Sequence, residues 1–185
     1  MTITLNQKRN LLILARIVIA DNLGIAYPTK RDDLDLNDPF YSQKLGAFVT
    51  LHKSGVLRGC IGYITGIKDI VSTIEDMAYS AAFRDPRFSP LTRDEFDLID
   101  IEISILSPIA QVKSVEEIEV GRDGLIISNG INSGLLLPQV PVEQGWDLNS
   151  FLEHTCLKAC LPPDAWKRKD VLIEKFSATV FGEKE

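Results

Sequence analysis

The residues best suited to chemistry in this 185-residue chain lie in the segment Leu57-Arg58-Gly59-Cys60-Ile61-Gly62. In an extended strand, Arg58 and Cys60 are two residues apart and point to the same face. A guanidinium beside a thiol favours the thiolate, which is the nucleophilic form. Gly59 and Gly62 carry no side chain, so a ligand or another backbone can come close. The segment therefore predicts a nucleophilic or redox cysteine, with Arg58 stabilising the thiolate or binding an anionic substrate group.

A structural interpretation of the same segment stays open. A free cysteine between Leu57 and Ile61 is commonly a small buried residue. In that case Cys60 packs in the core, and the two glycines allow tight strand packing. The protein would then be a non-catalytic module that binds a nucleotide, a peptide or another protein.

Two further residues are candidates for acid–base chemistry, and the sequence does not fix whether Glu102 shares a cleft with Cys60. His52 lies on the preceding predicted strand, and hairpin pairing would bring it near the Arg58 end as a base; the alternative is a surface histidine at a turn. Glu102 lies among alternating isoleucines, on the polar side of another predicted strand. It is either a catalytic acid or base facing a cleft or part of a solvated sheet face.

Arginines alternate with aromatic residues in the segment Phe83-Arg84-Asp85-Pro86-Arg87-Phe88. Such mixing suits the stacking of bases and the binding of phosphates. Acidic residues nearby cancel much of this charge, so Asp–Arg pairs that fix a loop are an equal alternative. Asp85 and Arg87 are accordingly candidate substrate-binding residues.

Composition limits the classes of function that remain. The net charge of −6 disfavours general coating of nucleic acid, and no apolar run reaches the roughly 18 residues of a membrane helix. Three cysteines are an odd and low number for a disulfide framework, and Cys156 and Cys160, four apart in a predicted helix, do not suit a disulfide, so reduced thiols and a cytoplasmic location are expected. No CxxC pair, HExxH, P-loop or dinucleotide motif is present, so no metal site is predicted and no cofactor is assigned.

Local patterns predict the elements that position these residues. A capping box at Thr4 and Gln7 begins a helix that ends near Gly24. A hairpin is predicted at residues 46–62, a helix at 67–83 and a strand at 100–106. A second hairpin follows at 124–137, then a helix that begins near Asp147 or Asn149 and ends near 159, and a final strand at 171–181. Helices and strands do not alternate regularly, which favours an α+β fold with a mixed, largely antiparallel sheet and flanking helices.

The chain resembles the AMMECR family, named after a human chromosomal region linked to a multi-symptom syndrome. The hexapeptide at residues 57–62 matches the signature of that family, and further matches follow in order to the C-terminal part of the chain. They are Ala81-Ala82-Phe83, Asp85-Pro86-Arg87-Phe88, Pro90-Leu91, the strand with Glu102 and Ser104, Gly121-Arg122-Asp123-Gly124, Leu136-Leu137-Pro138-Gln139-Val140, Gly145-Trp146 and Lys158-Ala159. One departure is Cys160, where the family usually has glycine.

The resemblance implies one AMMECR-type domain over residues 1–185, with a larger and a smaller lobe and the hexapeptide near a cleft between them. It implies motif positions at Arg58, Gly59, Cys60, Gly62, Asp85, Arg87 and Glu102. The activity of the family is not established. Its members suggest an enzyme that modifies RNA or another macromolecule, and gene neighbours suggest a pathway shared with MEMO-like and radical-SAM proteins. The resulting hypothesis has Cys60 as nucleophile or proton donor and Glu102 as acid or base.

Overall fold

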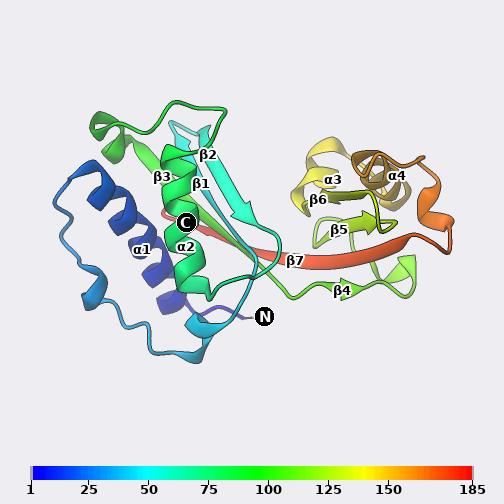
Figure 1. Ribbon diagram of the computed structural model, residues 1–185, viewed down its shortest axis with the longest axis horizontal. Helices are drawn as coiled ribbons and strands as arrows, with labels where there is room; N and C mark the ends of the chain where they lie inside the picture. Colours follow the sequence, from blue (N-terminus) through cyan, green and yellow to red (C-terminus); the bar gives the residue numbers. More distant parts are fainter. Residues whose placement is uncertain (1, 185) are drawn as a thin grey trace. The chain divides into compact units, whose positions relative to one another are not determined.

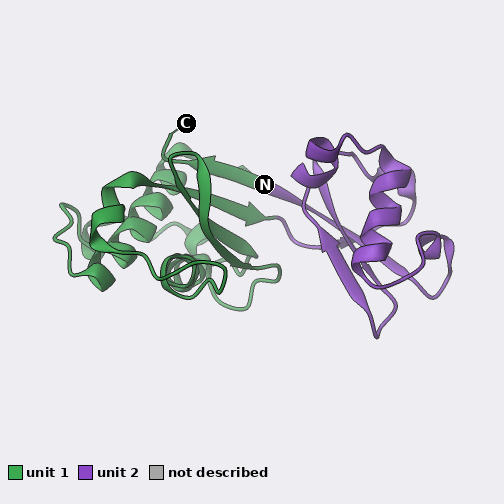
Figure 2. Ribbon diagram, turned by 90° about the horizontal axis from the view of Figure 1, so that it is seen from above, with its two compact units in different colours: residues 1–106, 179–185 green, residues 107–178 purple. Residues whose placement is uncertain are grey.

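The chain divides into two compact units (Figure 2). The computed structural model describes residues 2–184. Unit 1 comprises Met1–Leu106 and Thr179–Glu185, and unit 2 comprises Ser107–Ala178. A long final strand, β7 (Leu172–Gly182), contributes its first part to unit 2 and its end to unit 1 (Figure 1).

The sheet of unit 1 is antiparallel and has the strand order β2-β1-β3-β7. Its first three strands are β1 (Ala47–Lys53), β2 (Val56–Tyr63) and β3 (Ile99–Leu106). The turn between β1 and β2 is tight, because Ser54 and Gly55 both have positive φ. The pairing of these strands shifts between Leu51 and His52, where β2 contains one extra residue. This β-bulge falls within the hexapeptide.

Two helices, α1 (Leu5–Leu23) and α2 (Ile70–Phe83), cover one face of this sheet (Figure 1). The predicted capping box of Thr4 and Gln7 is present, and Gly24 ends α1 with a φ of 65°. The second helix begins at residue 70, three residues later than the hydrophobic pattern predicts. The reason is Asp69, whose carboxylate accepts the backbone N–H of Ser72 and caps the helix there.

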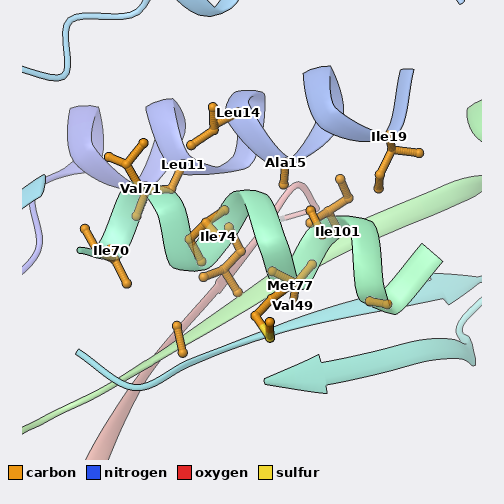
Figure 3. Packing of buried hydrophobic residues seen from close by; sticks show 14 of the residues in the cluster. Leu11, Leu14, Ala15, Ile19, Val49, Ile70, Val71, Ile74, Met77 and Ile101 are labelled. Carbon is orange, nitrogen blue, oxygen red and sulfur yellow. The ribbon is translucent and has the colours of Figure 1, made fainter. Parts of the chain in front are cut away.

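The core of unit 1 forms between the helices and the inner side of the strands. Figure 3 shows the side chains of α1 facing those of α2, with strand residues beneath. Alternate residues of β3 are buried while those between them are not, as their pattern predicts. The fully or nearly fully buried side chains include Leu11, Leu14, Ala15, Val49, Ile70, Ile74, Met77 and Ile101.

Unit 2 contains a smaller antiparallel sheet and two helices. Its strands are β4 (Ala110–Gln111), β5 (Asp123–Ser128), β6 (Ser133–Leu136) and the first part of β7. The helices are α3 (Gln139–Gln144), which the sequence patterns did not indicate, and α4 (Leu148–Lys158), capped by Asp147. After α4, Cys160 adopts a left-handed φ of 58°, the conformation that glycine favours.

The short 3-10 helices occupy the loops, at Arg31–Asp33, Pro39–Ser42, Arg93–Leu98, Val115–Glu117 and Ala165–Lys167. The predicted α+β class with a largely antiparallel sheet is confirmed. Across residues 2–184, no helix combines the length and the apolar character needed to cross a bilayer.

Candidate functional site

Three residues on neighbouring strands form a row across the sheet of unit 1. Thr50 of β1 is paired with Cys60 of β2 on one side and with Glu102 of β3 on the other. All three side chains are half-buried, whereas their neighbours Val49 and Leu51 are fully buried against the helices. The row therefore lies on the sheet face away from α1 and α2, which we call the thiol face. Cys60 and Glu102, assigned together from the sequence, do share this face.

Thr50 contacts the thiol directly, and the backbone pairing explains why. The N–H of Cys60 donates to Asp85 at 2.9 Å and its carbonyl accepts from Arg87 at 3.0 Å, so neither group bonds to β1. Cys60 and Thr50 are therefore a non-hydrogen-bonded pair, the arrangement in which opposite side chains lie closest. The Thr50 hydroxyl donates to Sγ at 3.2 Å. A hydrogen bond of this kind stabilises a thiolate.

Asp85 and Arg87 hold the free edge of β2 from the loop after α2. The Asp85 side chain is only 1% exposed, and it accepts from the backbone N–H of Cys60, from the backbone N–H of Arg87 and from the Arg87 guanidinium. Hydrogen bonds from Arg87 lower the pKa of Asp85 well below its usual range despite the opposing effect of burial. Asp85 and Arg87 thus hydrogen-bond to the backbone N–H and C=O of Cys60, the groups with which a further strand would otherwise pair.

Arg58 does not lie beside the thiol, so the expectation that Arg58 and Cys60 share a face is wrong. The bulge at Arg58 breaks the alternation, and its guanidinium donates to both oxygens of Glu95 at 3.1 and 2.9 Å. Lys53 also donates to Glu95, and these cations hold the pKa of Glu95 well below its usual range, with Arg58 the larger cause. Arg58 also lies over the ring of Phe88. Its Nη1 is buried with no acceptor among the described residues.

The two glycines of the hexapeptide are needed for packing on opposite faces of the sheet. A Cβ at Gly59 would lie 2.1 Å from the carbonyl oxygen of Ala81, so α2 approaches the strand backbone there. A Cβ at Gly62 would lie 2.3 Å from the ring of Phe48, which covers this position on the thiol face. The close approach of another backbone, expected at these glycines, thus occurs at Gly59.

His52 lies on the thiol face but not opposite Cys60. It pairs with Leu57 on β2 and with Asp100 on β3. Together with Glu102 it lines a cavity of about 320 Å³, whose other lining residues are Gly55, Asp100, Ile101, Gly182, Glu183 and Lys184. The second histidine, His154, stacks on Trp146 with ring centroids 3.9 Å apart in unit 2.

Sequence reasoning missed two residues that the structure brings to the hexapeptide. Thr50 gave no signal, because its place beside Cys60 depends on strand register. Glu95 did leave a signal, since Thr92 and Glu95 have the spacing of a capping box and form one at the short helix Arg93–Leu98.

Within residues 2–184, no three His, Cys, Asp or Glu side chains are grouped to hold a metal ion. The three cysteines are free thiols.

The fold and this row define an α+β protein of two units with a hydroxyl-bonded thiol on one sheet face. Comparison with known proteins identifies its family. The model of the AMMECR1 family matches residues 12–181, so the chain belongs to that family, and the resemblance seen in its sequence is confirmed.

Two archaeal relatives and one solved structure show the extent of the likeness. A protein of Methanothermobacter thermautotrophicus is 43% identical over 96% of this chain and 95% of its own length. One of Methanocaldococcus jannaschii is 48% identical over 78% of this chain and 76% of its own. The crystal structure of uncharacterized protein PH0010 from Pyrococcus horikoshii covers 94% of this chain and 90% of that one, with 43% identity and a TM-score of 0.77. The names of these three relatives state no activity.

Proposed function

We propose that the protein is a thiol-dependent enzyme that modifies a macromolecule on the thiol face. The observation that supports this most is the row of Cys60, Thr50 and Glu102, in which the Thr50 hydroxyl bonds to Sγ at 3.2 Å. A half-buried thiol with a hydroxyl donor beside it is suited to nucleophilic chemistry.

The spacing of the row assigns a distinct role to each residue. Cys60 is the nucleophile or proton donor, and Thr50 stabilises its thiolate. Strand separations of about 4.8 Å put Glu102 roughly 10 Å from Cys60 along the row, too far to take the proton of the thiol. Glu102 therefore acts as acid or base on a substrate group that lies over Thr50.

The substrate is a protein segment in preference to RNA. Glu102 on the thiol face and the net charge of −6 oppose the phosphates of a nucleic acid. The proposal includes a cytoplasmic location, which three free thiols favour, and a pathway shared with MEMO-like and radical-SAM proteins.

The other motif residues position the thiol, and one of them also reaches solvent. Asp85 fixes the backbone at Cys60, and Arg58 fixes the bulge through Glu95. Arg87 is 53% exposed although it bonds to Asp85 and to the Cys60 carbonyl. Its outer edge is the group best placed to bind an anionic part of the substrate.

A binding module with a structural Cys60 is the second candidate function, and the glycines favour it. Gly59 and Gly62 are explained by the packing of Ala81 and Phe48 alone, without any ligand. In this alternative the hexapeptide only joins β2 to α2 and to the loop after it. The two functions differ in the reactivity that they require of the thiol.

Alkylation of Cys60 by iodoacetamide in the folded protein tests the proposal. Cys160 is exposed and is replaced by serine, while Cys156 is buried and stays; peptide mass spectrometry assigns the modified residue. We expect rapid alkylation at pH 7, and a rate lower by roughly threefold or more in Thr50→Val, which lacks the donor to the thiolate. Glu102→Gln should alkylate at the wild-type rate, because Glu102 does not contact the thiol.

The same variants separate catalysis from thiol reactivity. Protein extracts from cells that carry the wild type, Cys60→Ser or Glu102→Gln are compared by mass spectrometry for a modification present with the wild type alone. A thiol that reacts only when the protein unfolds would contradict the proposal and favour the binding module. So would a modification pattern that is the same in all three strains.

A further inference from the structure

We infer that unit 1 carries a second binding surface, a groove between α1 and the end of β7 that takes an extended acidic and apolar peptide as an added β-strand. The groove lies at the β7 edge of the sheet, whereas Cys60 lies on β2 at the opposite edge. It is separate from the proposed function and does not depend on it.

The end of β7 presents unpaired backbone groups. The N–H of Glu183 donates to the carbonyl of Ile101, and the carbonyl of Ser177 accepts from the N–H of Ser107. The backbone N–H and C=O groups of odd-numbered residues in this part of the chain therefore point toward β3. The backbone groups of Val180 and Gly182 consequently face the other edge. Pairing with β5 on that edge ends at Ser177. In the described chain, no strand takes this edge of β7 after that residue.

A cavity of about 480 Å³ lies directly along this edge. One wall is α1, which contributes Leu5, Lys8, Arg9, Leu12 and Ile13. The other is the end of β7, with Phe181 and Gly182, and Glu183 directly after it. Leu5 on the α1 wall is 85% exposed, so apolar surface is available in the groove beside the free backbone groups. A helix that flanks the edge of a sheet is the geometry used for peptide binding by strand addition.

The charges along the groove select an acidic occupant. Lys8 and Arg9 have no carboxylate partner within residues 2–184, and Lys8 lies over the ring of Phe181 at 5.5 Å. Glu183 is neutralised by Arg16 at 2.6 Å, and this pair ties β7 to α1 at one end of the groove. The N-terminal end of the α1 dipole adds positive potential near Lys8. The partner is therefore an extended peptide that carries apolar side chains and Asp or Glu.

Selection from a phage-displayed library of random octapeptides tests this surface. We expect enrichment of peptides that combine β-branched or other apolar residues with Asp or Glu. The most enriched peptide is then synthesised and titrated into ¹⁵N-labelled protein. The amide signals of Val180 and Gly182 should shift, and the affinity should fall with added salt.

Two variants separate charge recognition from strand addition. Lys8→Glu with Arg9→Glu should weaken binding by about tenfold or more, whereas Lys113→Glu with Lys169→Glu, an equal charge change on exposed residues, should not. Val180→Pro removes an N–H from the free edge and leaves the bonds to β3, so it should abolish binding while Val180→Ala retains it. Thermal unfolding checks that each variant folds, and Cys60→Ser should bind as the wild type does.

Three results of the selection and binding experiments would overturn the inference, and so would one result of the NMR titration. They are the failure of any peptide class to be enriched, the enrichment of basic peptides, and equal binding by a folded Val180→Pro variant. Signals that shift on β2 instead of β7 would likewise place the peptide elsewhere.

Discussion

The backbone N–H of Cys60 donates to the buried carboxylate of Asp85 at 2.9 Å, so a loop residue fixes the strand position of the thiol. Asp85 in turn is held by Arg87, which returns a hydrogen bond to the Cys60 carbonyl. Both backbone groups of one residue on an edge strand are thereby satisfied by one ion pair. The residues that follow α2 thus position the hexapeptide of β2.

Replacing Asp85 should destabilise unit 1. We expect Asp85→Asn to lower the free energy of unfolding by about 2 kcal/mol, because Arg87 loses its carboxylate partner and a buried hydrogen-bond network is broken. Urea denaturation followed by circular dichroism measures the change. Asp170→Asn is the matched control: Asp170 pairs with Arg168 on the surface, and its loss should cost less than about 1 kcal/mol. Equal effects of the two variants would contradict the role of Asp85.

Stability should fall in acid because, among the carboxylates with lowered pKa values in the folded state, Asp85 and Glu95 are lowered most strongly. Arg87 lowers the pKa of Asp85, and Arg58 lowers that of Glu95. Such groups contribute stability that is present above the unfolded pKa of about 4 and is lost as the pH falls toward the folded value. The unfolding free energy should therefore decline from about pH 4 to pH 2, and less steeply in a variant with Asp85→Asn and Glu95→Gln. Parallel slopes in the two proteins would exclude these groups as the cause.

The glycines of the hexapeptide should differ in how they tolerate alanine. Gly59→Ala places a Cβ against the rigid backbone of Ala81 and should be strongly destabilising, by about 2 kcal/mol or more. Gly62→Ala meets the ring of Phe48 at 2.3 Å and the carbonyl oxygen of Ala47 at 2.5 Å, so Phe48→Ala should relieve the first part of its effect and leave the second. Gly182→Ala is the control, since its Cβ meets only ordinary contacts of 3.5 Å and beyond. Thermal unfolding of the single and double variants measures these losses of stability. The prediction is contradicted if Phe48→Ala reduces the destabilisation by Gly59→Ala as much as that by Gly62→Ala.

Cys160→Gly should stabilise the protein. Cys160 adopts a φ of 58°, where a Cβ costs roughly 1–2 kcal/mol, and glycine recovers this at the expense of some unfolded-state entropy. A net gain of about 0.5–1 kcal/mol is expected from urea denaturation. Cys160→Ala keeps the Cβ and should be nearly neutral. A loss of stability on Cys160→Gly would mean that the thiol makes contacts that outweigh the strain.

The elements themselves could be predicted because their signals are local. Thr4 and Gln7 begin α1 and Gly24 ends it, since the capping groups lie within one turn of the helix. The isoleucines of β3 alternate with polar residues, so the buried side of that strand could be read directly. The short helix α3 escaped because it has six residues and contains a proline.

The surroundings of Cys60 could not be read in the same way, because they depend on contacts between distant segments. Alternation alone put Arg58 beside Cys60, but a bulge formed in the pairing of β1 with β2 turned Arg58 toward Glu95. Thr50 reached the thiol through strand register, a property of the hydrogen-bonded sheet and not of either strand.

By itself, the sequence determined the class of fold, most of the elements and the position of the hexapeptide on the second strand. Tertiary structure decided which side chains surround the thiol and which edge of the sheet stays unpaired. The physical reason is that helix caps and hydrophobic alternation act over a few residues. Register, bulges and edges arise only when strands distant in sequence pair with one another.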